Sequence, residues 1–480
     1  MLPWPSDRTG KRIVQSFRAI SLNIAGCLIL AAGLVATTIS SASARTEATL
    51  LIEAASGKVL EAENATFPWH PASLTKLMTA YVTLKAVKDG RITLNTLYTV
   101  SPNAASQSPS KMGFPPGTHV TVDNALKMLM VKSANDMAVV LAEGVGGSVD
   151  GFSAMMNATA QRLGMTQTRY VNPNGLPDDR QVTSARDMAI LARAIIHDLP
   201  EYEYFVHIPA IRYGHRVIAN FNKLIGRFPG ADGMKTGFIC ASGFNLVASA
   251  TQNGRRLIAV VLGAPTSRAR SIEAIKLLDR GFSGGNLAWL RPALGTVDHL
   301  APIDAAPPDL RAEVCGPRRK RPASDDPGDD TAAGVAGTNP ALAFFSTGLK
   351  PPTLRPEDML AAAAAPADPV PVYTGPARTG ADIMAAVEAD AARQAAHARK
   401  ARAARRSHRR GRAAKRTTSH GRVSVTVETR KSGGKKASGK QTGQPKAAAK
   451  HGGARHSASA ETRPAKPRPV KPKPAGAARH

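Results

Sequence analysis

Cysteine is scarce in this sequence, with three residues among 480, at Cys27, Cys240 and Cys315. So few thiols cannot form the disulfide framework of a small secreted domain. We expect Cys240 to be a free, half-buried thiol, because Cys315 lies in a segment with the composition of a linker. A single bridge between the two stays open in an oxidising compartment. Since paired cysteines and a His-x-x-x-His pattern are both missing, we expect neither a structural zinc site nor another cofactor.

The C-terminal part of the chain lacks aromatic residues and almost lacks acidic ones. Residues 391–480 contain 26 Lys and Arg against Glu428 and Glu461, a formal charge of +24 out of +29 for the whole chain. A polycation of this kind binds polyanions, but it has no interleaved aromatic side chains to stack on bases. We therefore expect no nucleic acid partner. Anionic lipid headgroups or wall polyanions are the expected partners, and a solvated spacer without a partner is the alternative.

The N-terminus has the three parts of a secretory signal. Basic residues from Arg8 to Arg18 precede the apolar run of residues 19–40, and a small-x-small site follows at 42–44. This order is typical of a signal peptide, here over residues 1–44. The run is also long enough to span a bilayer, so an uncleaved anchor remains an alternative. In either case the rest of the chain is expected in the periplasm or on the outer face of the cytoplasmic membrane.

Residues 45–285 have the pattern of one folded domain with strands at both ends. Two apolar runs flank a Ser-Gly pair within residues 48–65, and two β-rich runs flank Asn253-Gly254 within residues 243–264. Both patterns predict β-hairpins. Strands at the two ends of a domain can meet in one antiparallel sheet.

Helical periodicity fills the space between the two hairpins. Residues 122–147 have helical apolar spacing on both sides of a break near Ser133, and residues 184–196 follow a serine cap. A further helix over residues 271–282 is expected to stop at Gly281. The sequence therefore predicts an α+β fold, an antiparallel sheet flanked by helices.

Beyond residue 285 the apolar periodicity fades. Residues 286–380 are rich in Pro, Ala and Gly and are expected to form a mostly disordered linker. Residues 381–410 have the composition of an Ala-rich helix, which Gly411 is expected to end. The remainder of residues 381–480 reads as a long, disordered, basic low-complexity tail.

The segment PASLTKLMTA, residues 71–80, places a serine and a lysine on one helix face. Ser73 and Lys76 are three residues apart, so their side chains meet in a helix. Ser-x-x-Lys is a common pattern, and this chain has it again at Ser108 with Lys111 and at Ser432 with Lys435. Pro109 in the first repeat and two glycines in the second argue against a helix. The pair indicates a catalytic site only together with other residues that complete it.

Two further motifs follow in the same domain. VKSAND contains Ser133 and Asn135 at the break between two helices, where side chains can point into a cleft. DGMKTGF contains Lys235, Thr236 and Gly237 just before the second hairpin, which places them on a sheet-edge strand. The order Ser-x-x-Lys, Ser-x-Asn, Lys-Thr-Gly within one domain is far more specific than any of its parts.

With these motifs, the domain resembles the serine-type D-alanyl-D-alanine carboxypeptidases of peptidase family S11, the low-molecular-weight penicillin-binding proteins. The segments SGKVL, PASLTKLMTAYV, SANDMAVVLAE, SARDMA and GFNLVASAT look like that family's blocks and cover roughly residues 48–265. The resemblance implies the β-lactamase/penicillin-binding transpeptidase-like fold. It also implies hydrolysis of the terminal D-Ala-D-Ala bond of peptidoglycan stem peptides, with β-lactam antibiotics as inhibitors.

The resemblance assigns the catalytic roles to three residues. Ser73 is the nucleophile that forms the acyl ester, Lys76 is the general base, and Ser133 relays a proton to the leaving D-alanine. A serine hydroxyl needs an adjacent base to attack a carbonyl, and Lys76 can be that base only if desolvation and a second cation lower its pKa.

The remaining site residues are implied to bind the substrate. Lys235 supplies the second cation and, with Thr236, binds the terminal carboxylate, while Asn135 holds the substrate amide. Gly237 lets the strand lie close to the substrate. The backbone N–H groups of Ser73 and Phe238 are expected to form the oxyanion hole.

Three other functions stay open at this stage. A D,D-endopeptidase that cuts cross-links uses the same residues. A β-lactamase needs a carboxylate beside the deacylating water, for which Asp178 and Asp179 are the candidates. A non-catalytic cationic envelope-binding protein needs only the tail. The residues after Lys-Thr-Gly, FICASG, depart from the polar residue that many relatives carry there, which leaves substrate preference undecided.

Overall fold

The computed structural model describes residues 47–283, 294–317 and 354–419. Two compact units divide the chain, residues 1–408 and 409–480. Of the second unit only the end of a helix is described. The expected signal peptide and most of the basic tail lie outside the described residues.

A five-stranded antiparallel sheet forms the centre of the first unit, in the order β2-β1-β9-β8-β7. Its strands are β1 Ala48–Glu53, β2 Val59–Glu63, β7 Ala231–Ile239, β8 Gly243–Gln252 and β9 Arg255–Ala264. Both predicted hairpins are confirmed, and β1 pairs with the late strand β9, so the sheet joins the two ends of the domain. Nearly every residue of β1, β8 and β9 is buried, as expected for a sheet that is covered on both faces.

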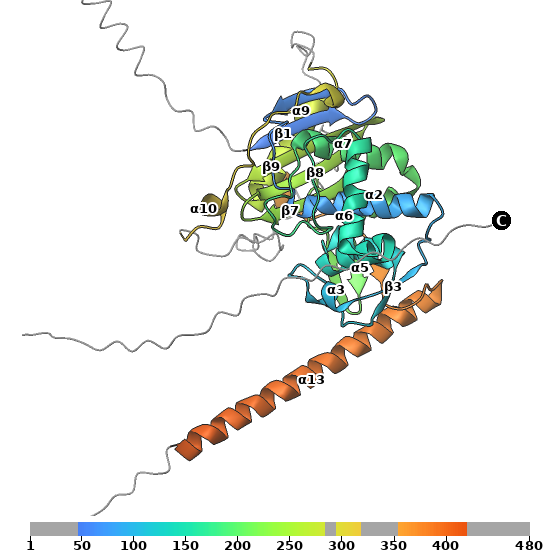
Figure 1. The fold of residues 1–480 in the computed structure, drawn as a ribbon, viewed down its shortest axis with the longest axis vertical. Helices are drawn as coiled ribbons and strands as arrows, with labels where there is room; N and C mark the ends of the chain where they lie inside the picture. The colour runs from blue at the N-terminus through green and yellow to red at the C-terminus, as the bar shows by residue number, and fades with distance from the viewer. Residues whose placement is uncertain (1–46, 284–293, 318–353, 420–480) are drawn as a thin grey trace, which may run out of the picture. The chain divides into compact units, whose positions relative to one another are not determined.

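The helices of the domain lie between its two predicted hairpins in sequence, except for the last one, which follows the second hairpin, and Figure 1 shows how they surround the sheet. They are α2 Thr75–Lys88, α3 Pro102–Ser106, α4 Val122–Val131, α5 Asn135–Gly146, α6 Val149–Arg162, α7 Ala185–Asp198, α8 Tyr204–His207 and α9 Ser267–Ser283, with the 3-10 turns η1 Ala72–Leu74 and η2 Pro200–Tyr202. Helices α7 and α9 pack on the sheet, and α4, α5 and α6 pack around α2. The predicted α+β fold, an antiparallel sheet flanked by helices, is confirmed.

Helix α2 is buried on all sides through its first ten residues, Thr75 to Leu84. A surface helix has one apolar stripe and one polar face, and α2 has no such polar face over this length. Polar groups in α2 therefore need partners inside the protein. This is why Lys76 in α2 cannot be an ordinary solvated lysine.

Side-chain caps set several of the helix starts. Ser184 accepts a hydrogen bond from Asp187 N at the start of α7, and Thr121 accepts one from Asn124 N at the start of α4. Such caps satisfy backbone N–H groups that have no partner within the helix. The break predicted near Ser133 falls between α4 and α5, as expected.

Two small sheets lie outside the main one. Strand β3 Leu97–Thr99 pairs with β4 His119–Thr121. Strands β5 Ala210–Tyr213 and β6 Arg216–Ala219 form a hairpin, and β10 Val370–Val372 pairs in parallel with β5. The sequence did not predict β10, because three residues within a Pro- and Ala-rich segment carry no strand pattern.

Cys240 and Cys315 form a disulfide, so the expectation of a free Cys240 is wrong. Cys240 follows β7 directly, and Cys315 follows the short helix α10 Arg311–Val314. The buried side chains of Leu310 and Val314 hold this segment on the domain, and Leu310 N donates to Ala241 O at 3.0 Å. Two apolar residues among prolines and alanines were too weak a signal to predict this contact.

The expectation of a mostly disordered linker over 286–380 is wrong for two stretches, residues 294–317 and 354–380. They contain η4 Val297–His299, α10, α12 Pro356–Ala361 and β10. Residues 284–293 and 318–353 lie outside the described part of the chain. The helix predicted from residue 381 is present as α13 Ala381–Ser419. No helix in the described ranges combines the length and apolarity needed to cross a bilayer.

Both predicted glycine stops are wrong, because α9 continues through Gly281 and α13 through Gly411. At Gly281 a Cβ atom would lie 2.6 Å from a methyl group of Leu257 and 2.8 Å from one of Leu51. Glycine at this position serves close packing of α9 on the sheet rather than the end of the helix.

Candidate active site

Ser73 lies in the turn η1, at the point where the chain enters α2. Ala72, just before it, has a φ of +48°, a left-handed conformation that is costly for a residue with a side chain. Leu74 N donates to Pro71 O at 3.1 Å and closes the turn. The carbonyl group of Ala72 packs so closely on Gly175 that a Cβ atom there would clash. The turn thus presents a half-buried Ser73 between buried neighbours.

Lys76 lies in the first turn of α2, and its side chain is fully buried. Its Nζ is 2.9 Å from Ser73 Oγ, and it donates to Asn135 Oδ1 at 2.7 Å and to the Asn174 carbonyl oxygen at 2.5 Å. These two oxygens can only accept hydrogen bonds. A neutral amine has two N–H groups and one lone pair. When Asn135 and Asn174 take the N–H groups, the lone pair is left for the hydroxyl proton of Ser73.

The electrostatics favour this neutral amine. Burial lowers the pKa of Lys76 well below its ordinary value, and the positive charge of Lys235 lowers that pKa further. The negative charge of Asp136 raises the pKa of Lys76, but this effect is smaller than the two that lower it. A lysine with a depressed pKa can accept a proton near neutral pH.

Ser133 and Asn135 lie where α4 ends and α5 begins. Ser133 has a φ of +58°, a conformation found at sharp changes of chain direction. Asn135 is held from both sides of its amide, since Oδ1 accepts from Lys76 and Nδ2 donates to the Ser108 carbonyl oxygen at 2.8 Å. The side chain of Asn135 therefore connects Lys76 of α2 with the loop that contains Ser108.

The Lys-Thr-Gly motif lies on β7, the edge strand of the main sheet, as predicted. Lys235 and Thr236 are both buried, and Lys235 Nζ donates to the Thr236 carbonyl oxygen at 3.0 Å. A Cβ atom at Gly237 would lie 3.0 Å from Leu74 N and 3.1 Å from Ser73 N. Glycine is needed because β7 approaches the turn of Ser73 this closely.

Phe238 follows the motif on β7 and is partly exposed. Its ring stacks on Phe244 of the neighbouring strand β8, with a centroid distance of 4.3 Å. This cross-strand pair steadies the end of β7 next to Ser73.

Two buried hydroxyl groups of the motifs have no protein partner within the described structure. They are Ser133 Oγ and Thr236 Oγ1. Buried polar atoms almost always have a hydrogen-bond partner. Their place, in the two motifs that flank Ser73 and Lys76, is consistent with partners supplied by a bound substrate.

One residue of each motif thus acts on Lys76: Ser73 and Asn135 contact its Nζ, and the charge of Lys235 lowers its pKa. Two other participants could not be predicted from the sequence. The Asn174 carbonyl oxygen binds Lys76 directly, and only a backbone atom is involved, so the residue type carried no signal. Asp136, fully buried, accepts from Met112 N at 3.1 Å and from Gly113 N at 2.8 Å. These bonds fix the loop of residues 108–113 against the start of α5.

The second Ser-x-x-Lys pattern has no comparable environment. Ser108 and Lys111 lie in a loop, as expected. The ammonium group of Lys111 donates to the Ala105 carbonyl oxygen at 2.8 Å. The motif alone therefore does not create a site, and burial in α2 distinguishes Lys76 from Lys111.

The carboxylates considered for a β-lactamase are engaged elsewhere. Asp178 forms a two-oxygen contact with Arg180, at 3.0 and 2.8 Å, and these hydrogen bonds lower the pKa of Asp178 to about 2. Asp179 is 92% exposed and lies 3.9 Å from Arg311. A carboxylate with so low a pKa is a weak general base. Among the described residues, no group of three His, Cys, Asp or Glu side chains could hold a metal ion.

The fold and the site define an active-serine protein with a lysine as the candidate base. The profile of the D-alanyl-D-alanine carboxypeptidases, peptidase S11, matches residues 35–266. The D-alanyl-D-alanine carboxypeptidase DacB2 of Mycobacterium tuberculosis is 31% identical over 240 residues, which cover 48% of this chain and 79% of the relative. The chain belongs to the peptidase S11 family, and the predicted family is confirmed.

Other relatives have a higher sequence identity, but the match covers a smaller share of their length. DacC of Escherichia coli is 42% identical over 253 residues, covering 51% of this chain and 63% of DacC. DacA of Haemophilus influenzae is 41% identical over 240 residues, covering 49% of this chain and 61% of DacA. The chain thus spans about three fifths of the length of these two relatives. The crystal structure of penicillin-binding protein 5 from Haemophilus influenzae shares 39% identity with it, over 49% of this chain and 70% of that one, at a TM-score of 0.48.

Proposed function

We propose that this protein is a serine-type D-alanyl-D-alanine carboxypeptidase that removes the terminal D-alanine from peptidoglycan stem pentapeptides through an acyl-enzyme on Ser73. One observation carries the proposal: the buried Lys76 amine is 2.9 Å from Ser73 Oγ, and two oxygens occupy its N–H groups. Membership in peptidase S11 and the similarity to two D-alanyl-D-alanine carboxypeptidases, DacC and DacB2, support the same reaction.

Acylation begins with the proton of Ser73. The hydroxyl proton moves to the lone pair of Lys76 Nζ while Oγ attacks the carbonyl carbon of the penultimate D-alanine. The backbone N–H groups of Ser73 and Phe238 receive the oxyanion, and each such donor contributes on the order of 10²–10³ in rate. Ser133 then passes the proton to the nitrogen of the leaving D-alanine. The C–N bond breaks and the acyl ester on Ser73 remains.

Substrate binding uses the cation of β7. Lys235 attracts the terminal carboxylate of the peptide and Thr236 donates its hydroxyl to the same group. This contact gives the buried Thr236 Oγ1 the partner that it lacks within the described residues. Asn135 holds the substrate amide through the N–H of Nδ2 that does not donate to Ser108, and its contact with Lys76 couples binding to the base.

In deacylation, Lys76 takes a proton from a water molecule while the water oxygen attacks the ester carbon. The bond between that carbon and Ser73 Oγ then breaks, and Lys76 returns the proton to Oγ. Slow deacylation of a penicilloyl ester makes β-lactam antibiotics inhibitors rather than substrates. The low pKa of Asp178 and its pairing with Arg180 disfavour the β-lactamase alternative. A D,D-endopeptidase that cuts cross-links remains the second candidate, because it would use the same residues.

The place of action proposed here is outside the cytoplasm, in the periplasm or at the outer face of the cytoplasmic membrane. The export signal pattern of residues 1–44 and the peptidoglycan substrate support this location. The basic tail is proposed to bind anionic lipid headgroups or wall polyanions. Its 26 Lys and Arg over residues 391–480 are the feature that supports such partners.

The test is the intact mass of the chain of residues 45–480 after exposure to a labelled penicillin, beside a Ser73→Ala variant. A stable adduct that the variant lacks supports the acyl-enzyme mechanism. D-alanine release from a peptide that ends in D-Ala-D-Ala, compared with cleavage of a cross-linked peptide dimer, separates carboxypeptidase from endopeptidase. Rapid loss of penicillin without an adduct would favour a β-lactamase. A folded protein with no adduct and no turnover of either substrate would overturn the proposal.

A further inference from the structure

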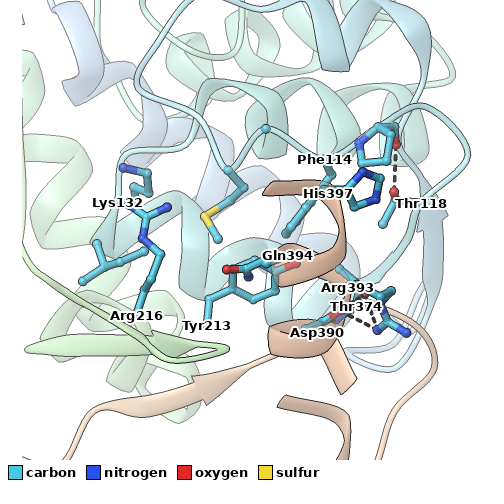
Figure 2. Close-up of a pocket in the computed structure, with 14 residues that line it drawn as sticks. Phe114, Thr118, Lys132, Tyr213, Arg216, Thr374, Asp390, Arg393, Gln394 and His397 are labelled. Carbon is cyan, nitrogen blue, oxygen red and sulfur yellow. Dashed lines mark hydrogen bonds and ion pairs between the residues drawn. The ribbon is translucent and has the colours of Figure 1, made fainter. Parts of the chain in front are cut away.

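A cavity of about 610 Å³ lies outside the catalytic site, behind the loop that holds Asn135. Its volume is within the range of small-molecule binding sites. Figure 2 shows its walls, which come from three parts of the chain far apart in sequence: residues 112–118, the β5–β6 hairpin, and residues 374–397. The proposed carboxypeptidase reaction uses none of these side chains.

The β5–β6 hairpin supplies one wall with a defined face. Tyr213 and Arg216 are cross-strand partners, so they lie on the same face of the hairpin. Ile218, two residues along β6, lies on that face as well, and all three line the cavity. Arg212 and Val217 are the neighbouring cross-strand pair and point to the other face. The hairpin thus presents one cation and two apolar bodies to the cavity.

Residues 374–397 form another wall of the cavity, and hydrogen bonds to Asp390 connect its two ends. Asp390 is 1% exposed. It accepts hydrogen bonds from Thr374 N and Thr374 Oγ1, each at 2.8 Å, and from Arg393 Nε at 3.0 Å. Phe114 packs edge-to-face on Tyr213, with a centroid distance of 5.3 Å, and closes the apolar part of the cavity. These contacts make the cavity a built feature of the first unit.

The charges around the cavity do not balance. The only carboxylate among its lining residues, Asp390, is already engaged by Arg393 and Thr374. Lys132 and Arg216 have no ion pair or side-chain hydrogen bond anywhere in the described structure, and in Figure 2 both point toward the same end of the cavity. Two cations that converge without an anion repel each other and favour a bound negative group.

We propose that this cavity binds a small amphipathic anion. The carboxylate or phosphate of the ligand lies between Lys132 and Arg216, where a guanidinium can bind two oxygens at once. Its apolar body lies against Met112, Phe114 and Tyr213. The site is separate from the proposed reaction, so binding does not require hydrolysis. It meets the catalytic site at two places: the loop of residues 108–113, whose other side binds Asn135 and Asp136, and the end of α4, where Lys132 directly precedes Ser133.

Isothermal titration of the chain of residues 45–480 tests the proposal with three probes. N-acetyl-phenylalanine carries a carboxylate on an apolar body, phenyl phosphate carries a phosphate, and N-acetyl-phenylalanine amide is neutral. We expect at least one of the two anions to bind, and the neutral amide to bind at least about tenfold more weakly. The preferred anion identifies whether the acidic group is a carboxylate or a phosphate.

The variant Arg216→Gln should weaken binding of the preferred anion roughly tenfold or more, which corresponds to about 1.4 kcal/mol. Arg212→Gln is the matched control, because Arg212 lies on the same hairpin but on its other face, and it should leave binding unchanged. Arg216 is exposed, so its replacement should not disturb folding. If thermal melting shows otherwise, Lys132→Gln replaces it.

Three results would overturn the proposal. The first is no binding of either anion at millimolar concentration. The second is equal binding of the anion and the neutral amide. The third is equal loss of affinity in Arg216→Gln and Arg212→Gln. Penicillin acylation is measured on the same samples and tests the proposed function separately. A protein that is inactive at Ser73 can still bind the anion, so failure of one proposal is distinguishable from failure of the other.

Discussion

Two pairs of cations in this protein differ in their surroundings and therefore in what they can do. Lys76 and Lys235 are 0% and 1% exposed, whereas Lys132 and Arg216 line an open cavity and are partly or largely exposed. In the buried pair, desolvation and the charge of Lys235 lower the pKa of Lys76. The cavity pair, by contrast, lies where solvent has access and has no ion pair within the described structure. The different surroundings of the two pairs therefore support the proposed base at one site and the proposed anion-binding site at the other.

Replacing Lys76 by methionine should have the largest effect, because it removes the base from the buried pair. Acylation by penicillin should slow by about 10²–10⁴, the usual contribution of a general base. Stopped-flow measurement of adduct formation tests this. Lys111→Met is the matched control, since Lys111 follows Ser108 in the same pattern without burial, and its rate should stay within about twofold. Equal loss in both variants would contradict the role of Lys76.

The same Lys76→Met variant should alter the pH dependence of stability. Lys76 has a lowered pKa in the folded protein and its ordinary value near 10.5 after unfolding. The unfolded state therefore binds more protons in that window, and stability rises with pH toward the ordinary pKa. Methionine removes this slope. Denaturant unfolding at several pH values, for the wild type and the variant, should show a flatter curve for the variant.

Opening the disulfide next to the buried pair should chiefly reduce stability. Cys240 follows the strand of Lys235, and the bridge to Cys315 closes a loop of 75 residues. A double Cys→Ser variant should lose about 2–4 kcal/mol in the free energy of unfolding, with a smaller loss in acylation rate. Denaturant unfolding of both proteins checks the first part. A rate loss as large as that of Lys76→Met would mean that the bridge holds the site itself.

Replacing Lys235 by glutamine removes the second positive charge of the buried pair. Losing a charged hydrogen bond to the substrate carboxylate should cost about 1.5–3 kcal/mol in the transition state. Without the positive charge of Lys235, the pKa of Lys76 rises. Since the base must be neutral, the acid limb of the pH–rate profile should move to higher pH. Arg216→Gln, which alters the cavity pair, should leave that limb in place, and a shift in both variants would contradict the comparison.

Removing the cations of the basic tail, which belong to neither pair, should have the smallest effect on the acylation rate. Deletion of residues 401–480 takes away 23 Lys and Arg but keeps Asp390 and Arg393, which line the cavity. Acylation should change by less than about twofold, while salt-dependent binding to anionic vesicles or isolated walls should be lost. Sedimentation with vesicles measures the second effect. Undiminished binding of the truncated protein would contradict a binding role for the tail.

Much of the fold followed from local patterns. The hairpin at Asn253-Gly254 and the serine-capped helix α7 were predicted because turn residues and apolar periodicity act within a few residues of each other. The predicted end of α9 at Gly281 was wrong because this glycine serves close packing of the helix on the sheet. That packing depends on side chains distant in sequence, such as Leu51. The disulfide and β10 were missed because each depends on a contact between segments far apart in sequence.

The sequence by itself determined the chemistry: the identity and order of Ser73, Lys76, Ser133, Asn135 and the Lys-Thr-Gly motif indicated the family and an active serine. Only the tertiary structure decided which lysine can act as a base. A pKa depends on burial and on charges from other segments, and α2, β7 and the Asn174 carbonyl group meet only in the folded chain. The cavity of Lys132 and Arg216 was likewise decided by the tertiary structure, because its three walls come from segments that are distant in sequence.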